Sequence, residues 1–101
     1  MDKEQLYTLI TRGNANELDT ALQSGLDVNS TLPNGNQMII TAACMGDARL
    51  DMVKILVKYG ADINTPMEGM TLLKWIKQPY YSDNERIIAF LEEKGAKEAD
   101  L

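Results

Sequence analysis

Apolar residues between Leu6 and Gly25 recur at spacings of three and four, which is the pattern of one buried face of an α-helix. Gly13 and Asn14 divide them into two segments, and Gly25 closes the second. The apolar positions of the two segments are Leu6, Leu9, Ile10, Leu18, Ala21 and Leu22. Because almost nothing separates the segments, they are predicted to form two antiparallel helices joined as a hairpin.

The same order of helix, turn, helix and glycine returns twice further along the chain. The apolar pattern and its stop signals predict helices from Met38 to about Gly46, from Leu50 to Gly60, from Thr71 to Lys77, and from a cap at Ser82 or Asp83 to Gly95. The polar segment 27–37 contains Asn34-Gly35, a pair that tolerates positive φ and predicts a turn or a small β-hairpin. Segment 62–70 predicts a second turn region.

The composition favours helices over sheets. The chain has 101 residues, of which 45% are hydrophobic, and this suits one domain with a modest core. Only 6% of the residues are aromatic, so the core must consist mainly of Leu, Ile, Val, Met and Ala, which is typical of packed helices. The predicted fold class is therefore all-α, in a single domain.

An internal repeat underlies this order of elements. The segment QSGLDVN at 23–29 returns as KYGADIN at 58–64 and more weakly as EKGAKEA at 93–99, so that a glycine recurs every 35 residues. After the first two copies come the turn glycines Gly35 and Gly69, and then the segments QMIITAA at 37–43 and TLLKWIK at 71–77. Together these segments resemble the ankyrin repeat, a β-turn and two antiparallel helices with the signature TPLHxA.

The resemblance implies an ankyrin-type solenoid of three helix-turn-helix units, about 4–29, 30–64 and 65–97, with short β-turn or hairpin fingers. Asp47-Ala48 and the connection 78–84 depart from the family pattern and are expected to form loops along one edge. Residues 98–101 are expected to be a frayed tail. The polar ends favour a complete protein of three units that is monomeric when free.

Charge and residue chemistry narrow the function. The net charge of −5 repels nucleic acid and anionic lipid, and it favours encounter with a basic protein partner. The chain has no histidine and a single cysteine, Cys44, so no metal or other cofactor is expected. No nucleophile is paired with a base and no glycine loop would cradle phosphate, so no catalytic residues and no enzyme activity are expected. The start of the chain has no leader-like apolar run, and cytoplasmic localisation is predicted.

Ankyrin-like proteins share a fold and not a target, so the resemblance places partner contacts on the concave face made by turn tips and first helices. In this chain the concave-face positions, together with the long connection 78–84, give the predicted contact residues. These are Asn34, Asn36, Met45, Met67, Glu68, Met70, Tyr80 and Tyr81. The methionines suit adaptable apolar contacts, and at least one of the two tyrosines is expected to be exposed.

Other conspicuous side chains have structural interpretations. Trp75 is expected to cover the end of the core, and Cys44 to act as a small apolar residue, because no His or nearby Lys would lower its pKa. Four acidic residues lie in the loops and at the starts of second helices, where a carboxylate stabilises a helix N-terminus. The alternative is that they form an acidic edge that binds a basic partner. These residues are Asp47, Asp51, Asp83 and Glu85.

The sequence therefore predicts a protein-protein interaction module that acts by stoichiometric binding. A small acidic inhibitor or immunity-type protein that masks its partner is the main interpretation, because the chain carries no recognisable catalytic or targeting unit. An adaptor or scaffold that links two proteins is the alternative. The two differ in that an inhibitor needs one binding face, whereas an adaptor needs two separable ones.

Overall fold

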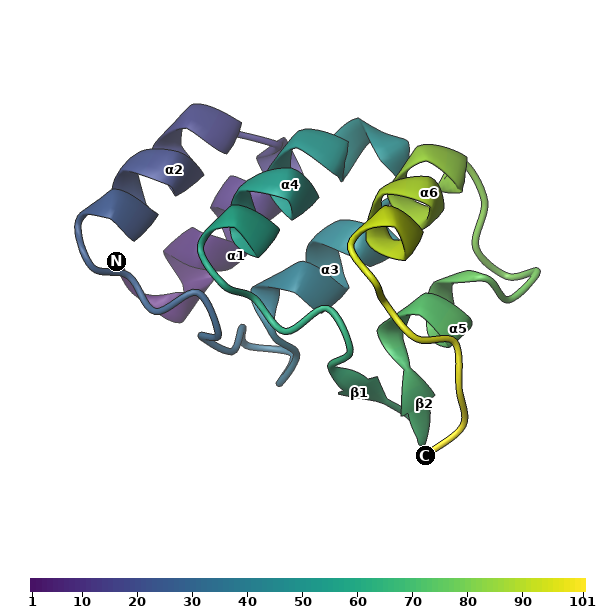
Figure 1. Cartoon of the computed structure of the whole chain (residues 1–101). Coiled ribbons are helices and arrows are strands. Elements are labelled where there is room, and N and C mark those ends of the chain that lie inside the picture. The colour runs from purple at the N-terminus through teal and green to yellow at the C-terminus, as the bar shows by residue number, and fades with distance from the viewer.

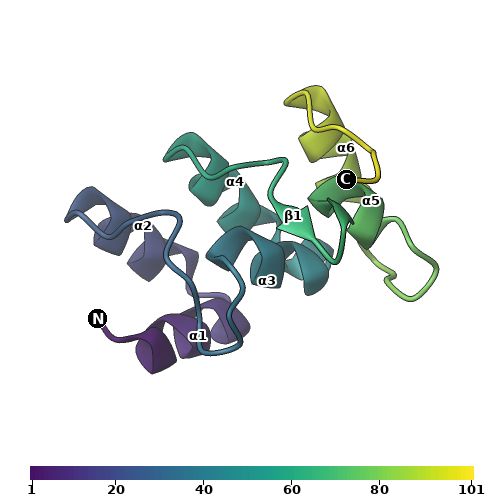
Figure 2. The same cartoon turned by 90° about the horizontal axis from the view of Figure 1, so that it is seen from below.

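A computed structural model describes all 101 residues, which form three helical pairs (Figure 1). The helices are α1 (Lys3–Arg12), α2 (Ala15–Gln23), α3 (Met38–Cys44), α4 (Leu50–Lys58), α5 (Leu72–Ile76) and α6 (Glu85–Glu93), with a 3₁₀ turn, η1 (Asp47–Arg49), before α4. Neighbouring pairs are in contact, so α1, α3 and α5 form one layer, the first-helix layer, and α2, α4 and α6 form the second-helix layer (Figures 1 and 2). All six predicted helices are confirmed.

The prediction of an all-α solenoid is wrong. The turn region 62–70 contains a true antiparallel sheet, in which β1 (Pro66–Met67) pairs with β2 (Met70–Thr71). The loop between the strands is Glu68-Gly69, and both residues have positive φ (50° and 79°), the backbone of a tight hairpin turn. With extents of 33 × 23 × 22 Å the molecule is a compact mixed α and β globule and not an extended array, because three short pairs add little length.

The core lies between the two helical layers. It consists of 21 buried apolar residues that form one cluster, drawn from all six helices, and Trp75 is half-buried against it, as predicted.

The start of α1 is fixed by residues next to it in the sequence. The Asp2 carboxylate accepts a hydrogen bond from Gln5 N (2.8 Å), and the Gln5 side chain accepts one from Asp2 N (2.9 Å). This capping box satisfies two amides that the helix itself leaves free. No helix is both long enough and apolar enough to cross a lipid bilayer.

The internal repeat reappears in the backbone hydrogen bonds that close each pair. Equivalent N–H to carbonyl bonds, 35 residues apart, join Leu26 to Ala21, Ala61 to Leu56 and Ala96 to Leu91. After the first two pairs the carboxylates of Asp27 and Asp62 accept hydrogen bonds from Asn29 N and Asn64 N, both at 2.9 Å. The Asp and Asn residues of the repeat therefore form the same turn in both copies.

The 3₁₀ turn η1 fastens the middle pair to both of its neighbours. The Asp47 carboxylate accepts hydrogen bonds from Arg86 N (3.1 Å) and Ile87 N (2.9 Å) in the first turn of α6. Arg49 donates from Nε to the carbonyl of Ile10 (2.8 Å) at the end of α1. An anion at a helix N-terminus and a cation at a helix C-terminus both match the helix dipole. The helix-terminus interpretation of Asp47 is thus confirmed, but the helix belongs to the next pair.

Replacement of Asp47 by alanine is expected to lower the free energy of unfolding by about 1–2 kcal/mol, because two amides of α6 lose their cap. Asp51 is the matched control, since it lies exposed in the first turn of α4 and makes no hydrogen bond, and Asp51→Ala should change stability by less than about 0.5 kcal/mol. Urea denaturation followed by circular dichroism measures both. Equal losses would show that only the carboxylate charge matters.

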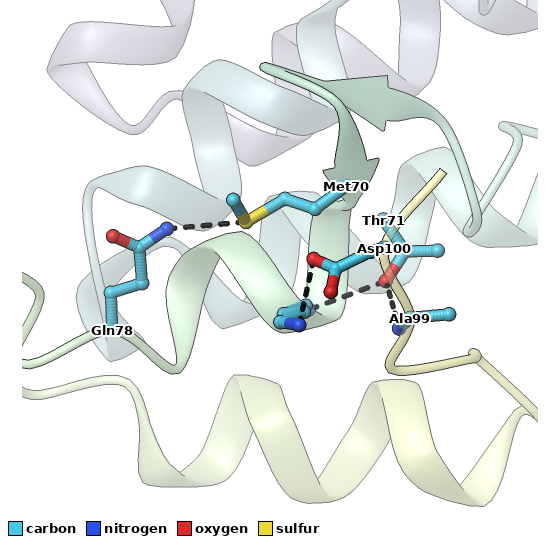
Figure 3. A network of polar contacts seen from close by, with 6 residues as sticks. Met70, Thr71, Gln78, Ala99 and Asp100 are labelled. Atoms are coloured by element: carbon cyan, nitrogen blue, oxygen red, sulfur yellow. Dashed lines mark hydrogen bonds and ion pairs between the residues drawn. The ribbon is translucent and has the colours of Figure 1, made fainter.

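The prediction of a frayed C-terminal tail is also wrong. Thr71 N donates to the Ala99 carbonyl (2.9 Å), Ala99 N donates to Thr71 Oγ1 (3.1 Å), and Asp100 forms an ion pair with Lys74 at 2.7 Å (Figure 3). Leu101 N donates to the carbonyl of Gly69 (2.8 Å). The tail is ordered because the second edge of β2 offers backbone groups that would otherwise lack partners.

Deletion of residues 98–101 is expected to lower the free energy of unfolding by about 1–2 kcal/mol, since hydrogen bonds of roughly 1 kcal/mol each are removed from the edge of β2. Asp100→Asn removes the ion pair alone, and because that pair is solvent-exposed it should cost about 0.5 kcal/mol or less. A frayed tail would leave the denaturation midpoint of the deletion unchanged.

Candidate functional site

A groove with no charged residue lies in the first-helix layer, where α1 and α3 run side by side next to the turn segments (Figure 2). Its volume is about 260 Å³. The residues that line it, called here the α1–α3 groove, are Tyr7, Thr11, Asn34, Asn36, Ile40, Thr41, Cys44, Met45, Met67 and Tyr81. On a chain with 25 charged side chains, 15 acidic and 10 basic, an uncharged hollow is a distinct chemical feature.

The groove brings together five of the eight predicted contact residues. These are Asn34, Asn36, Met45, Met67 and Tyr81. The turn 34–36 is closed by a hydrogen bond that the Asn34 side chain accepts from Asn36 N at 3.0 Å. The turn tip, the end of α3 and the last connection thus meet, although they are far apart in sequence.

The other three predicted residues lie outside the groove. Glu68 is exposed at the hairpin turn. Met70 is half-buried on β2, and its sulfur accepts a hydrogen bond from Gln78 Nε2 at 3.2 Å (Figure 3), so it faces its own unit. Tyr80 is 85% exposed, and its ring packs edge-on against Tyr81 with 5.1 Å between centroids. The prediction that at least one tyrosine is exposed is confirmed.

Five residues of the groove are not among the predicted contact residues: Tyr7, Thr11, Ile40, Thr41 and Cys44. One signal was present, because Tyr7 and Thr11 are four apart on α1 and lie off its buried face. An aromatic side chain on the polar face of an amphipathic helix has no core to fill. Ile40 carried no such signal, since its spacing is that of an ordinary core residue.

Tyr81 is fixed at the rim of the groove by an aromatic cluster. Trp75 Nε1 donates to the Tyr81 hydroxyl at 2.9 Å, and the two rings lie 5.9 Å apart. Tyr80 packs edge-on against the same Tyr81 ring. The cluster therefore presents an aromatic edge whose position is set before any partner arrives.

The groove is electrically neutral around pH 7. Burial raises the pKa of the Cys44 thiol above its ordinary value, and contacts with Tyr81 and Trp75 offset this only in part. Burial also raises the pKa of the Tyr81 hydroxyl. Since the thiolate is the reactive form of cysteine, Cys44 is a weak nucleophile here. No group of three His, Cys, Asp or Glu side chains is placed to hold a metal ion.

A larger hollow, of about 640 Å³, lies along α1 and α2 at the N-terminal end of the molecule. Its wall carries Asp2, Glu4 and Glu17 together with Arg12, and its only apolar side chains are Met1 and Leu9. Leu9 is already buried in the core. This surface offers water-exposed charges of both signs and no fixed apolar anchor, so the smaller α1–α3 groove is the better candidate site.

No protein-family model matches this chain, and no curated protein is significantly similar to it. The ankyrin resemblance therefore depends on the repeated residues themselves and on the turns that they form.

Proposed function

We propose that this protein binds another protein through the α1–α3 groove and the adjoining Tyr80, and that it acts by stoichiometric binding. One observation carries the proposal. Apart from the terminal residues Met1 and Leu101, the exposed large apolar side chains of the chain are Tyr7 (39% exposed), Met45 (40%) and Tyr80 (85%), and all three lie in or beside this groove. Clustered exposed apolar side chains mark protein contact sites.

The chemistry of the groove fits a protein partner. Tyrosine and methionine are enriched at interface centres, where charged residues are depleted. The fixed Tyr81 and Asn34 lower the ordering cost of binding, which favours a tight complex. The net charge of −5 adds long-range attraction for a partner that is basic outside the contact patch, and it disfavours nucleic acid and membranes.

Masking of the partner, as in an inhibitor or immunity-type protein, is the action we favour, and an adaptor that links two proteins is the alternative. We propose no catalytic role, because the groove contains one weakly nucleophilic thiol and no base. The protein is proposed to act as a cytoplasmic monomer before it meets its partner. The repeated Asp27 and Asp62 turns support kinship with ankyrin-repeat sequences, although the fold is not all-α.

The test is affinity capture from the source cells with tagged protein, followed by measurement of complex size and of the partner's own activity. A complex of one copy of each chain, in which the partner's activity falls, would support the inhibitor. Two different proteins held at once would favour the adaptor instead. Recovery of only general chaperones, in amounts that a Tyr7→Glu, Met45→Glu variant does not change, would overturn the proposal.

A further inference from the structure

A third hollow lies in the second-helix layer, between α4 and α6, which are neighbours in Figure 1. Its volume is about 410 Å³. Its lining residues, called here the lysine groove, are Lys54, Val57, Lys58, Phe90, Glu93 and Lys94. Three of these six side chains are positively charged on a protein whose net charge is −5.

Two lysines of this groove lie beside one aromatic ring, that of Phe90, and the third, Lys58, lies over the ring of Tyr59. Lys54 Nζ lies 5.8 Å from the centroid of Phe90, and Lys94 Nζ lies 5.7 Å from the same centroid. Lys58 follows Lys54 by one helical turn on α4. Phe90 is half-buried against the core, so part of its ring remains open between two ammonium groups. The groove thus combines an apolar floor with a rim of three ammonium groups and one carboxylate, Glu93, which is positive on balance.

None of these lysines has a carboxylate partner within the chain, although the chain carries 15 acidic residues. The two ion pairs of the molecule use Lys74 and Lys77. Positions near helix C-termini explain Lys58 and Lys94, because a cation there matches the helix dipole. They do not explain Lys54, which stands one turn before Lys58 where like charges repel.

We infer that the lysine groove binds a short acidic segment of a protein, with carboxylates on the three ammonium groups and an apolar side chain over Phe90. Charge complementarity identifies this occupant: a short segment meets only the local positive rim, whereas a long polyanion also meets the overall negative field. This surface lies in the other helical layer from the α1–α3 groove. The protein then has two binding faces, which the proposed masking function does not require.

The test uses the full chain and a fluorescein-labelled peptide of Glu and Asp with one central Leu, measured by fluorescence anisotropy at low ionic strength. Saturable binding that weakens as salt is added is expected. The variant Lys54→Gln, Lys58→Gln, Lys94→Gln should weaken binding about tenfold, since three exposed charge contacts are lost. The matched variant Arg12→Gln, Lys97→Gln, Arg86→Gln changes the net charge equally at other places and should bind as wild type does.

Other outcomes would overturn the inference. Equal weakening by the two triple variants would show attraction by overall charge alone, and no binding would remove the site. Tighter binding of a single-stranded oligonucleotide of matched charge, or of vesicles containing phosphatidylserine, would assign the groove to a different occupant. Peptide binding should persist in the Tyr7→Glu, Met45→Glu variant, so failure of the α1–α3 groove proposal and failure of this one can be told apart.

Discussion

Replacement of Tyr7 and Met45 by glutamate is expected to weaken binding of the captured partner about a hundredfold or more. Both side chains line the α1–α3 groove and are partly exposed, so in the complex each new carboxylate would be buried without a partner. The free energy of unfolding should change by less than about 1 kcal/mol, because neither side chain belongs to the buried core. Calorimetry against the purified partner and urea denaturation measure the two effects.

Met70 and Glu68 provide the matched control for this experiment. Both were predicted contact residues, and both lie outside the groove. Met70→Gln together with Glu68→Gln should leave affinity within about threefold of wild type. If this pair abolished binding and the Tyr7 and Met45 pair did not, the contact surface would be the hairpin tip and not the groove. Tyr80→Ser, tested alone, measures how far the interface extends beyond the groove.

Replacement of Gly46 by alanine is expected to lower the free energy of unfolding by about 3 kcal/mol. This is the largest effect expected for a Gly→Ala substitution in this chain. Gly46 has φ 91° and ψ −174°, a region open almost only to glycine. A Cβ atom there would also lie 2.9 Å from the backbone carbonyl oxygen of Asp83, which cannot rotate away as a side chain would. The same carbonyl accepts a hydrogen bond from Asp47 N, so the join between the second and third pairs would be disturbed.

Gly60 provides a control that has a positive φ but no close approach. Its φ of 96° is similar, but a Cβ atom there would meet nothing within 4 Å. Gly60→Ala should therefore cost about 1–2 kcal/mol, from strain alone. Denaturation midpoints of the two variants give the difference. Equal losses would mean that the Asp83 segment moves aside at little cost, and that the contact does not fix the last connection.

Whether the protein acts as an inhibitor or as an adaptor depends on what occupies the two grooves. The α1–α3 groove is neutral and apolar, and the lysine groove is positive, so they suit chemically different segments. They lie in different helical layers, and neither shares a lining residue with the other. If both are occupied at once, the protein links two partners. If the acidic segment belongs to the same partner, the lysine groove is a second contact of one masking complex.

Helix positions and the repeat could be predicted from the sequence because their causes are local. Apolar spacing of three and four places Leu6, Leu9 and Ile10 on one face whatever the rest of the chain does. The Asp27 and Asp62 turns are likewise made by residues two apart. Segment 62–70 was likewise predicted as a turn or hairpin finger that contains Gly69. Only the positive φ of Glu68 had no signal in the sequence, because that backbone conformation is uncommon for glutamate.

The sequence by itself determined six helices, their pairing and the repeat of 35 residues, and it predicted a set of methionines and tyrosines as contact residues. Only the tertiary structure decided which of these meet: Tyr7 with Met67 and Tyr81 in one groove, Asp47 with α6 across 40 residues, and the C-terminal tail with β2. Such contacts join segments distant in sequence, and their existence depends on the path of the whole chain. A local pattern fixes which face of an element is buried, but it does not fix the neighbour that covers it.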